Sequence, residues 1–339
     1  ESPGADPLSL PGGAGRAADG VVVVRGVGWG VSIKNLMYSE DFDDYSTARC
    51  RLADGVATLK FATSEVGQGF VTIAAQIART ILGIDDVVLD RIDSTIGSAG
   101  STSASRQTWM SGGAVDAACR AVRERLFETV GERYGIEPIR LLVDGTDVVD
   151  SAGDLRVPVV EATAGLELVE EVEYHHPPTE ELDELGQGNC HTAFAFVAHR
   201  AVVDVDPELG LVKVVQVATA QDVGNALNPL SVTGQIEGGI AQGLGLAVME
   251  EIIQDDRGVI RNGNFTDYLL PTFLDMPPVV ATLIEQPDPH APLGAKGVGE
   301  PPCISSTPAI VAAIRDALRS VGIDKPIDRV PIRPSDISL

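Results

Sequence analysis

Apolar residues recur along the chain at two spacings, one typical of helices and one typical of strands. Four stretches repeat apolar side chains every three or four positions, which predicts helices over 70–82, 108–134, 234–251 and 308–318. Shorter apolar or alternating runs predict strands over 21–24, 55–62, 87–92, 193–198, 201–205, 210–220, 264–270 and 279–284. The first two helices are followed by glycines, and Thr307 is placed to cap the last. Helices and strands interleave without a regular strand–helix–strand repeat, so the pattern predicts an α+β fold.

Composition divides the chain into three parts. Residues 1–20 are rich in Pro, Gly and Asp and lack an initiator Met and the regions of a signal peptide. They are predicted to be a linker or tail, which favours a fragment or processed product of a longer chain. Residues 150–185 are rich in Asp, Glu and Pro and predict a surface excursion or subdomain boundary. Two mixed α/β subdomains are therefore predicted, 21–165 and 166–339, with a glycine-rich turn at 26–30.

Charge and cysteine spacing exclude several classes of function. The formal net charge of −24 argues against binding to nucleic acids or anionic membranes. No run of 18 apolar residues predicts a membrane span. The histidines have no partners at metal-ligand spacing, so no metal bound by side chains is predicted. The cysteines lie far apart and are predicted to be free, mostly buried thiols in a reducing cytoplasm: Cys50, Cys119, Cys190 and Cys303.

Two loops ahead of helices offer groups that suit an anionic or oxygen-rich ligand. In SEVGQG, residues 64–69, glycines let backbone N–H groups face an anion and Gln68 adds an amide; the alternative is a tight strand–helix connection. In GSAGSTSASRQ, residues 97–107, small hydroxyl side chains and Arg106 suit a phosphate-like group. The alternative there is a solvated loop that only caps the helix.

Two further glycine-rich segments lie in the second half of the chain. GQIEGGIAQGLG, residues 234–245, keeps a helical apolar stripe although its glycines cost about 4–5 kcal/mol of helix propensity. Close packing against another backbone or a ligand would offset this cost, unless the segment is not helical, and Gln235 would point its amide at that ligand. In GAKGVGEPP, residues 294–302, Pro301 biases Glu300 toward extended backbone. Glu300 is then either a charged group on a turn or a buried general base.

Taken together and in this order, the segments closely resemble the molybdenum hydroxylases, the family of xanthine dehydrogenase and aldehyde oxidase. The resemblance rests on EVGQG, GSTSASRQ with GGAVDAA, ATAQDVGNALNPLSVTGQIEGGIAQGLG and GAKGVGEPP, and it runs from about residue 25 to 320. It covers the C-terminal half of the family's molybdenum-cofactor subunit and is most similar to bacterial xanthine dehydrogenase. The implied fold is the molybdenum-cofactor-binding domain of xanthine dehydrogenase type, with the catalytic glutamate in the second subdomain.

The resemblance also implies a cofactor and the residues that hold it. The cofactor is molybdopterin, in bacteria commonly the cytosine dinucleotide form, and no protein side chain ligates its metal. Glu300 is implied to be the catalytic base, and Gln235 to hydrogen-bond near the metal's oxo group. The remaining implied cofactor contacts are Gly67, Gln68, Gly69, Ala104, Ser105, Arg106, Gln107, Lys296, Gly297, Val298 and Gly299. No role follows for Trp29 or for the segment around it.

The implied activity is hydroxylation of hypoxanthine or xanthine, with water as the oxygen source and Glu300 as general base. Electrons would leave through iron–sulfur clusters to FAD on partner chains. The family's first molybdenum domain would lie upstream or on another subunit, and the active form would be a dimer of the complete cytoplasmic assembly. Alternatives are the same chemistry on another N-heterocycle, such as nicotinate, or on an aldehyde, and a non-catalytic scaffold that only binds the cofactor.

Overall fold

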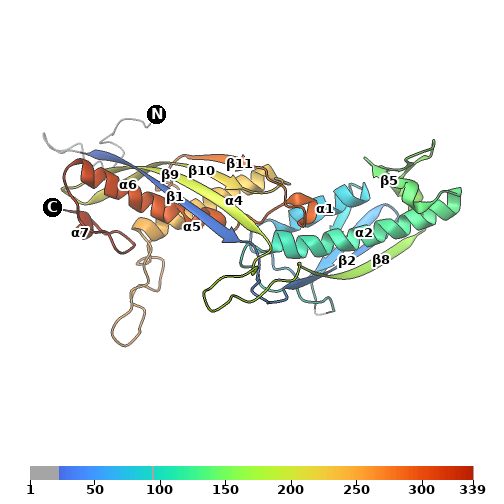
Figure 1. Ribbon diagram of the computed structural model, residues 1–339, viewed down its shortest axis with the longest axis horizontal. Coiled ribbons are helices and arrows are strands. Elements are labelled where there is room, and N and C mark those ends of the chain that lie inside the picture. The colour runs from blue at the N-terminus through green and yellow to red at the C-terminus, as the bar shows by residue number, and fades with distance from the viewer. Residues whose placement is uncertain (1–22, 94, 339) are drawn as a thin grey trace.

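The computed structural model describes residues 23–93 and 95–338, which form two lobes joined into one elongated molecule (Figure 1). The predicted linker, residues 1–20, lies outside the described residues. Each lobe is built on a four-stranded sheet with helices packed on one face. This combination of mixed sheets and helices confirms the predicted α+β class.

The first lobe holds a sheet in the order β4-β3-β2-β8. Its strands are β2 (Tyr45–Ala53), β3 (Val56–Phe61), β4 (Val87–Leu89) and β8 (Glu167–His175). Helices α1 (Phe70–Leu82) and α2 (Gln107–Tyr134) pack on it, and their apolar sides share one core with the sheet. The end of the lobe is formed by a 3-10 turn (Pro138–Arg140), β5 (Leu141–Asp144), β6 (Asp147–Asp150), β7 (Arg156–Pro158) and α3 (Val159–Ala162).

The second lobe holds a sheet in the order β1-β9-β10-β11. Its strands are β1 (Val24–Asn35), β9 (Phe194–Asp206), β10 (Leu211–Asp222) and β11 (Val279–Ile284). The helices are α4 (Pro229–Val248), α5 (Pro301–Ile304), α6 (Ser306–Ser320) and α7 (Pro334–Ile337), with a 3-10 turn at Pro292–Gly294. Helix α6 lies along β1 and β9, and α4 packs beside it, so the core lies between these helices and the sheet.

Strand β1 extends through residues that the sequence pattern assigned to a turn. The predicted glycine-rich turn at 26–30 is wrong, because these residues continue the strand. Gly26, Gly28 and Gly30 face helix α6, and a Cβ on any of them would overlap the backbone of α6 or of the residue before it. The alternate glycines therefore let the strand and the helix pack backbone to backbone.

Strand pairing does not follow the predicted division at residue 165. Strand β1 pairs antiparallel with β9 and belongs to the second lobe, whereas β8 pairs antiparallel with β2 and belongs to the first. The predicted surface excursion over 150–185 is therefore wrong for the part that forms β7, α3 and β8. A loop without regular structure begins after residue 175 and runs to β9.

Two predicted elements near the C-terminus also differ. The strand predicted over 264–270 is wrong, since this segment consists of turns with its side chains mostly exposed. The last helix begins at Ser306, and the predicted cap Thr307 lies inside it. The Thr307 hydroxyl instead donates a hydrogen bond of 2.8 Å to the carbonyl of Gly243, so it joins α6 to α4.

Helix α4 confirms close packing at two of its glycines. A Cβ on Gly239 would lie 2.7 Å from a carbon of Pro302 in α5, and one on Gly243 would overlap a hydroxyl of α6. Gly234 and Gly238 behave differently, because no atom lies within 4 Å of the Cβ position of either. One side of α4 thus packs tightly in the protein while another side presents bare backbone.

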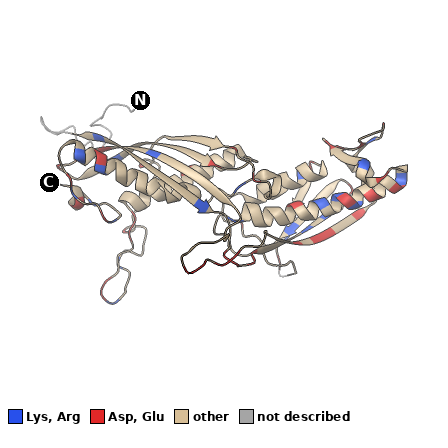
Figure 2. Ribbon diagram, viewed as in Figure 1, with Lys and Arg blue, Asp and Glu red and all other residues tan. Residues whose placement is uncertain are grey.

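The outer face of the second sheet is apolar and exposed. Trp29, Val31 and Ile33 of β1 alternate outward beside Phe194 and Phe196 of β9, and Val31 is 80% exposed. Charged residues gather instead on α2 and β8, at the far end of the first lobe (Figure 2). Among the described residues, no helix combines the length and apolar character needed to cross a bilayer.

Candidate cofactor-binding pocket

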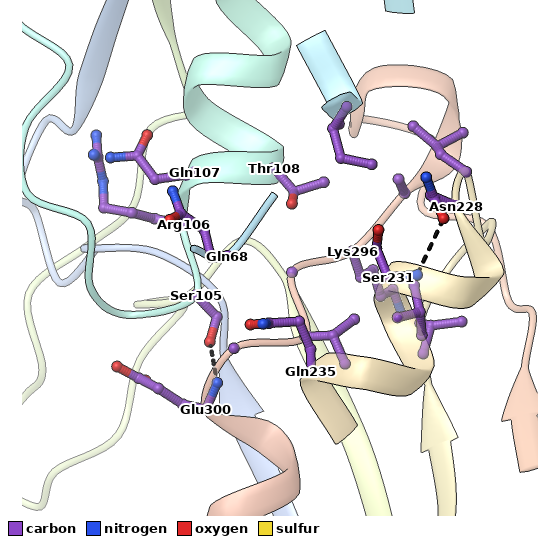
Figure 3. A pocket seen from close by; sticks show the side chains of 18 of the residues that line it. Gln68, Ser105, Arg106, Gln107, Thr108, Asn228, Ser231, Gln235, Lys296 and Glu300 are labelled. Carbon is purple, nitrogen blue, oxygen red and sulfur yellow. Dashed lines mark hydrogen bonds between the residues drawn. The ribbon is translucent and has the colours of Figure 1, made fainter. Parts of the chain in front are cut away.

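One pocket collects residues from all four glycine- and amide-rich segments and from both lobes (Figure 3). Most of the predicted site residues line it: Gln68, Ser105, Arg106, Gln107, Gln235, Lys296, Gly297, Val298, Gly299 and Glu300. Gly67 and Gly69 flank Gln68 and Ala104 precedes Ser105, without lining the pocket themselves. Hydroxyl and amide groups that the sequence reasoning missed also line it: Thr102, Ser103, Thr108, Asn225, Asn228 and Ser231.

The loop before α2 reaches the pocket through a strained turn. Ala104 and Ser105 have φ angles of 54° and 51°, in the left-handed region that non-glycine residues rarely adopt. Such residues cost on the order of 1–3 kcal/mol each, so the surroundings must hold them in place. One restraint comes from Gly297, where any Cβ would overlap the carbonyl of Ser105. The loop at 97–107 and the segment at 294–302 therefore fix each other.

Glu300 is attached to this strained turn. Its backbone N–H donates to Ser105 Oγ at 2.8 Å, and its Oε1 accepts the N–H of Ala104 at 2.9 Å. Lys34 Nζ lies 3.1 Å from Glu300 Oε2, a contact that the sequence reasoning missed. The carboxylate is thus held by two partners and the backbone of Glu300 by a third, and the residue still borders the pocket.

Two expectations about Glu300 differ from the structure. The side chain is 45% exposed in this chain, so the predicted burial is not met. Its backbone angles, φ −95° and ψ −31°, are helical rather than extended, because Glu300 occupies the capping position of α5. The preference that Pro301 imposes is therefore overridden by the helix that begins there.

The guanidinium of Arg106 turns away from the pocket (Figure 3). It is fully buried and pairs with both oxygens of Asp44, at 2.5 and 2.6 Å. Its other N–H groups donate to the carbonyls of Ala99, Ser101 and Tyr45. The prediction that Arg106 offers its charge to a phosphate is therefore wrong, because all five donors of the guanidinium are used. The side chain anchors the loop instead.

Lys296 is also paired within the protein. Its Nζ lies 2.7 Å from Asp222 Oδ2, and both side chains are less than one tenth exposed. This pair joins the segment at 294–302 to the end of β10. The charges of both cations that line the pocket are therefore neutralised by aspartates, which the sequence reasoning did not single out.

The turn at 64–69 fills its own anion site. The carboxylate of Glu65 accepts the N–H groups of Gly67, Gly69 and Val71 at 2.8, 3.0 and 3.1 Å. Burial opposes ionisation of Glu65, but these hydrogen bonds outweigh it and lower the pKa of the carboxyl. The prediction that free N–H groups face a ligand anion here is therefore wrong. Gln68, which bonds twice within the turn, keeps one N–H and one lone pair for a ligand.

Helix α4 presents its first turns to the pocket. Asn228 caps the helix by accepting the N–H of Ser231 at 3.1 Å, and both residues line the pocket with Gln235 one turn further on (Figure 3). Gly234 and Gly238 lie on an open side of the same turns. These two glycines do not line the pocket, so α4 contributes to it through the neutral side chains of Asn228, Ser231 and Gln235.

A buried polar chain lies behind the segment that carries Glu300. Ser305 Oγ lies 2.9 Å from both Ser32 Oγ and His199 Nδ1. Burial lowers the pKa of His199 to about 4. Burial, and after it the charges of nearby glutamates, raises the pKa of the Cys303 thiol. Both groups are therefore uncharged near neutral pH.

The chemistry of the pocket fits a flat heterocycle rich in nitrogen and oxygen. Its lining combines apolar side chains, which suit the faces of a flat ring, with neutral amides and hydroxyls, which suit the donors and acceptors along the edge of a pterin. Between residues 23 and 93 and between 95 and 338, no group of three or more His, Cys, Asp or Glu is placed to hold a metal ion. The lining residues thus fit the pterin of the cofactor that the resemblance implies.

Fold and pocket together define a domain that binds an organic cofactor between two α+β lobes. The sequence profile of the family described as molybdopterin cofactor-binding domain matches residues 13–277. The nicotine 6-hydroxylase large subunit of Paenarthrobacter nicotinovorans is 31% identical over 300 residues, which cover 83% of this chain and 35% of that protein. A putative xanthine dehydrogenase molybdenum-binding subunit of Escherichia coli is 27% identical over 295 residues, covering 83% and 37%.

Solved structures agree with these relatives. The crystal structure of quinoline 2-oxidoreductase from Pseudomonas putida 86 has a TM-score of 0.80 and 27% identity, covering 93% of this chain and 41% of that one. Other relatives are carbon monoxide dehydrogenase large chains and an aldehyde oxidoreductase molybdenum-binding subunit. The chain belongs to the molybdenum hydroxylase family, as part of its molybdenum-cofactor-binding subunit, and the cofactor of that family is molybdopterin. It spans only about two fifths or less of the length of these relatives.

Proposed function

We propose that this chain is the C-terminal part of the catalytic subunit of a hydroxylase that oxidises hypoxanthine or xanthine, with Glu300 as general base. The observation that carries the proposal is the placement of Glu300. Its carboxylate borders a pocket of neutral amides and hydroxyls, and Ala104 and Ser105 hold it there from a strained turn. A charged group that only decorated a turn would not need two partners from a distant segment.

The residues of the chain divide the work as follows. Gln68 and Gln235 offer amides to the edge of the cofactor, which when bound supplies oxygen derived from water and accepts two electrons from the substrate. The buried amide of Gln107 instead donates to the carbonyl of Ser101 and accepts from the Ser111 hydroxyl, so it supports the loop. Each Glu300 oxygen has one partner and keeps a second lone pair, so the carboxylate can still accept a proton. Ser105 Oγ fixes the backbone of Glu300 at the edge of the pocket.

The proposed partners follow from the length of the chain and from its apolar face. The exposed apolar face, made by Trp29, Val31, Ile33, Phe194 and Phe196, is typical of an interface, because monomers rarely leave large aromatic clusters in water. We assign it to the family's first molybdenum domain. Iron–sulfur clusters and FAD would then lie on further chains of a cytoplasmic assembly that is itself a dimer. The free cysteines of the chain fit a reducing compartment.

The substrate is proposed from the relatives. Nicotine 6-hydroxylase, xanthine dehydrogenase and quinoline 2-oxidoreductase are all named for N-heterocycles, which favours a substrate of that class over an aldehyde or carbon monoxide. Another N-heterocycle, such as nicotinate, or an aldehyde remains the alternative within the same chemistry. A panel of these compounds, tested on the complete assembly, separates the candidates.

The test of the proposed base is Glu300→Gln in the complete assembly. Turnover of hypoxanthine and xanthine should fall by about 10²–10⁴-fold, because the amide cannot accept the proton, while molybdenum and pterin contents stay at wild-type levels. Glu237→Gln, which changes an exposed carboxylate of α4, is the matched control and should keep full activity. Full activity in Glu300→Gln would remove the base from the mechanism. If the wild-type assembly held molybdopterin and oxidised no substrate of the panel, the scaffold alternative would stand instead.

A further inference from the structure

One face of strand β1 lies against α5 and α6. The proposed function does not explain the row of residues on this face. Alternate residues of a strand share one face, and here they are Gly26, Gly28, Gly30, Ser32 and Lys34. The glycines let the strand lie against α6, and Ser32 Oγ meets Ser305 Oγ just before that helix. Lys34, the last of the row, therefore arrives beside Glu300 at the start of α5.

The ammonium group of Lys34 contacts three oxygen atoms of the protein. Its Nζ lies 3.1 Å from Glu300 Oε2, donates to the carbonyl of Asn35 and lies 3.3 Å from Asn35 Oδ1. Asn35 is itself tied down, since its Nδ2 donates to the carbonyl of Met37 at 3.2 Å. Lys34 therefore hydrogen-bonds to Asn35 and forms an ion pair with Glu300. Its side chain is 16% exposed and does not line the pocket, so it is placed to act on Glu300 rather than on a substrate.

We infer that Lys34 is a positioning residue for Glu300. The N–H of Ala104 holds Oε1 and Lys34 holds Oε2, so partners from two distant segments fix the rotation of the carboxylate. Without Lys34 the half-exposed side chain is free to turn into solvent. Misplacing a catalytic group by about 1 Å can cost on the order of 100-fold in rate. This inference rests on the proposed role of Glu300 as the base.

The kinetic test is Lys34→Met in the complete assembly. The value of kcat should fall by about 10- to 100-fold with KM little changed, because the ammonium touches the base and not the substrate. Lys213→Met is the matched control: it removes another lysine of the same sheet, whose Nζ donates to the carbonyl of Leu274, and should leave kcat unchanged. In a Glu300→Gln background, Lys34→Met should cause no further loss. The anaerobic rate at which substrate reduces the enzyme makes these slow variants measurable.

A second test needs no turnover. In the assembled protein, Glu300→Gln should raise the rate at which an amine-acylating reagent modifies Lys34, because the ammonium loses the carboxylate that covers it. Peptide mass spectrometry gives this rate, and modification of Lys213 in the same sample should not change. An unchanged rate of Lys34 modification would overturn the ion pair itself. This test does not use the Lys34→Met variant, so it holds even if that variant fails to fold.

The kinetic outcomes are also decisive. Wild-type kcat in Lys34→Met, or a loss of full size in the Glu300→Gln background, would show that Lys34 does not act through Glu300. Failure of the wild-type assembly to oxidise any substrate would overturn the proposed function, and the positioning role with it. A failure of the Lys34 tests alone would leave the proposed function standing.

Discussion

At the scale of single residues, the turn that carries Ser105 depends on a buried ion pair. The side chains of Arg106 and Asp44 are 0% and 4% exposed and bond through two N–H groups. Taking charges out of water costs several kcal/mol each, and the cost is offset only while both partners are present. The pair therefore supports the pocket from behind rather than binding its ligand.

Replacing Asp44 by Asn should lower the free energy of unfolding by about 3–5 kcal/mol, because Arg106 would stay buried without its counter-charge. Urea unfolding of the purified protein, followed by circular dichroism, measures the change. Glu167→Gln serves as the control: it breaks a pair with Arg51 in which both side chains are well exposed, and it should cost less than about 1 kcal/mol. Equal small losses in the two variants would contradict the supporting role.

The gathering of Glu300, Gln235 and Ser105 around one pocket could be expected from the sequence, because each lies in a glycine-rich frame with a recognisable order; their chemical roles stay predictions. Their supports could not be expected. Arg106 meets Asp44 across 62 positions, and Lys296 meets Asp222 across 74. Ion pairs between residues so far apart in the sequence depend on tertiary packing. They produce no periodic pattern within a short stretch of sequence, so local patterns cannot predict them.

At the scale of elements, adjacent glycines of α4 offer a matched comparison. Gly239→Ala should destabilise the protein by about 1–3 kcal/mol, because the new methyl group would lie 2.7 Å from Pro302 and push α5 away. Gly238→Ala has no neighbour within 4 Å and should instead stabilise the helix by up to about 1 kcal/mol.

Thermal unfolding of the two α4 variants, with the molybdenum content of the assembly as a second readout, measures these effects. Similar shifts of the melting temperature in both variants would mean that helix propensity, and not packing against α5, determines the change in stability. Since α5 begins directly after Glu300, the Gly239 variant should also lose activity, whereas the Gly238 variant reports on the open side of the helix.

Local patterns predicted some elements to the residue and missed others entirely. Helix α1 and strand β11 have the predicted bounds, because an apolar stripe with a glycine stop and a short run rich in β-branched residues are clear signals. A strand was predicted over 21–24, but its continuation as β1 was assigned to a turn, because the glycines that contact α6 have the composition of a turn. The glycines of α4 posed the same problem, and only the apolar stripe identified them as helical.

At the scale of the whole molecule, the exposed apolar face bears on assembly. Ile33 and Phe196 lie opposite each other on adjacent strands, 63% and 53% exposed. Phe196→Asp should weaken association with the first molybdenum domain at least about tenfold, because it places a charge where an aromatic ring would be buried. Co-purification from cells that express all subunits measures this. Ile139→Asp, at a 92% exposed site in the other lobe, is the control and should assemble normally.

The sequence could predict two units of mixed helices and strands, but not which strands belong to each unit. Division by sequence position assigns β1 to the first unit and β8 to the second, whereas hydrogen bonding does the reverse. Which strands pair depends on which apolar faces meet in three dimensions. The order of strands along the chain predicts this pairing only for strands that are neighbours in the sequence.

The exchange of strands also orders events in time as the chain is made. The sheet of the first lobe needs only residues up to β8, so it can form while the rest of the chain is still being synthesised. Strand β1 precedes the strands of the first sheet along the chain but must wait for β9, and Lys34 waits longer still for the segment that carries Glu300. The pocket can therefore close only once residues 294–302 have been synthesised, and a chain cut before them cannot complete it.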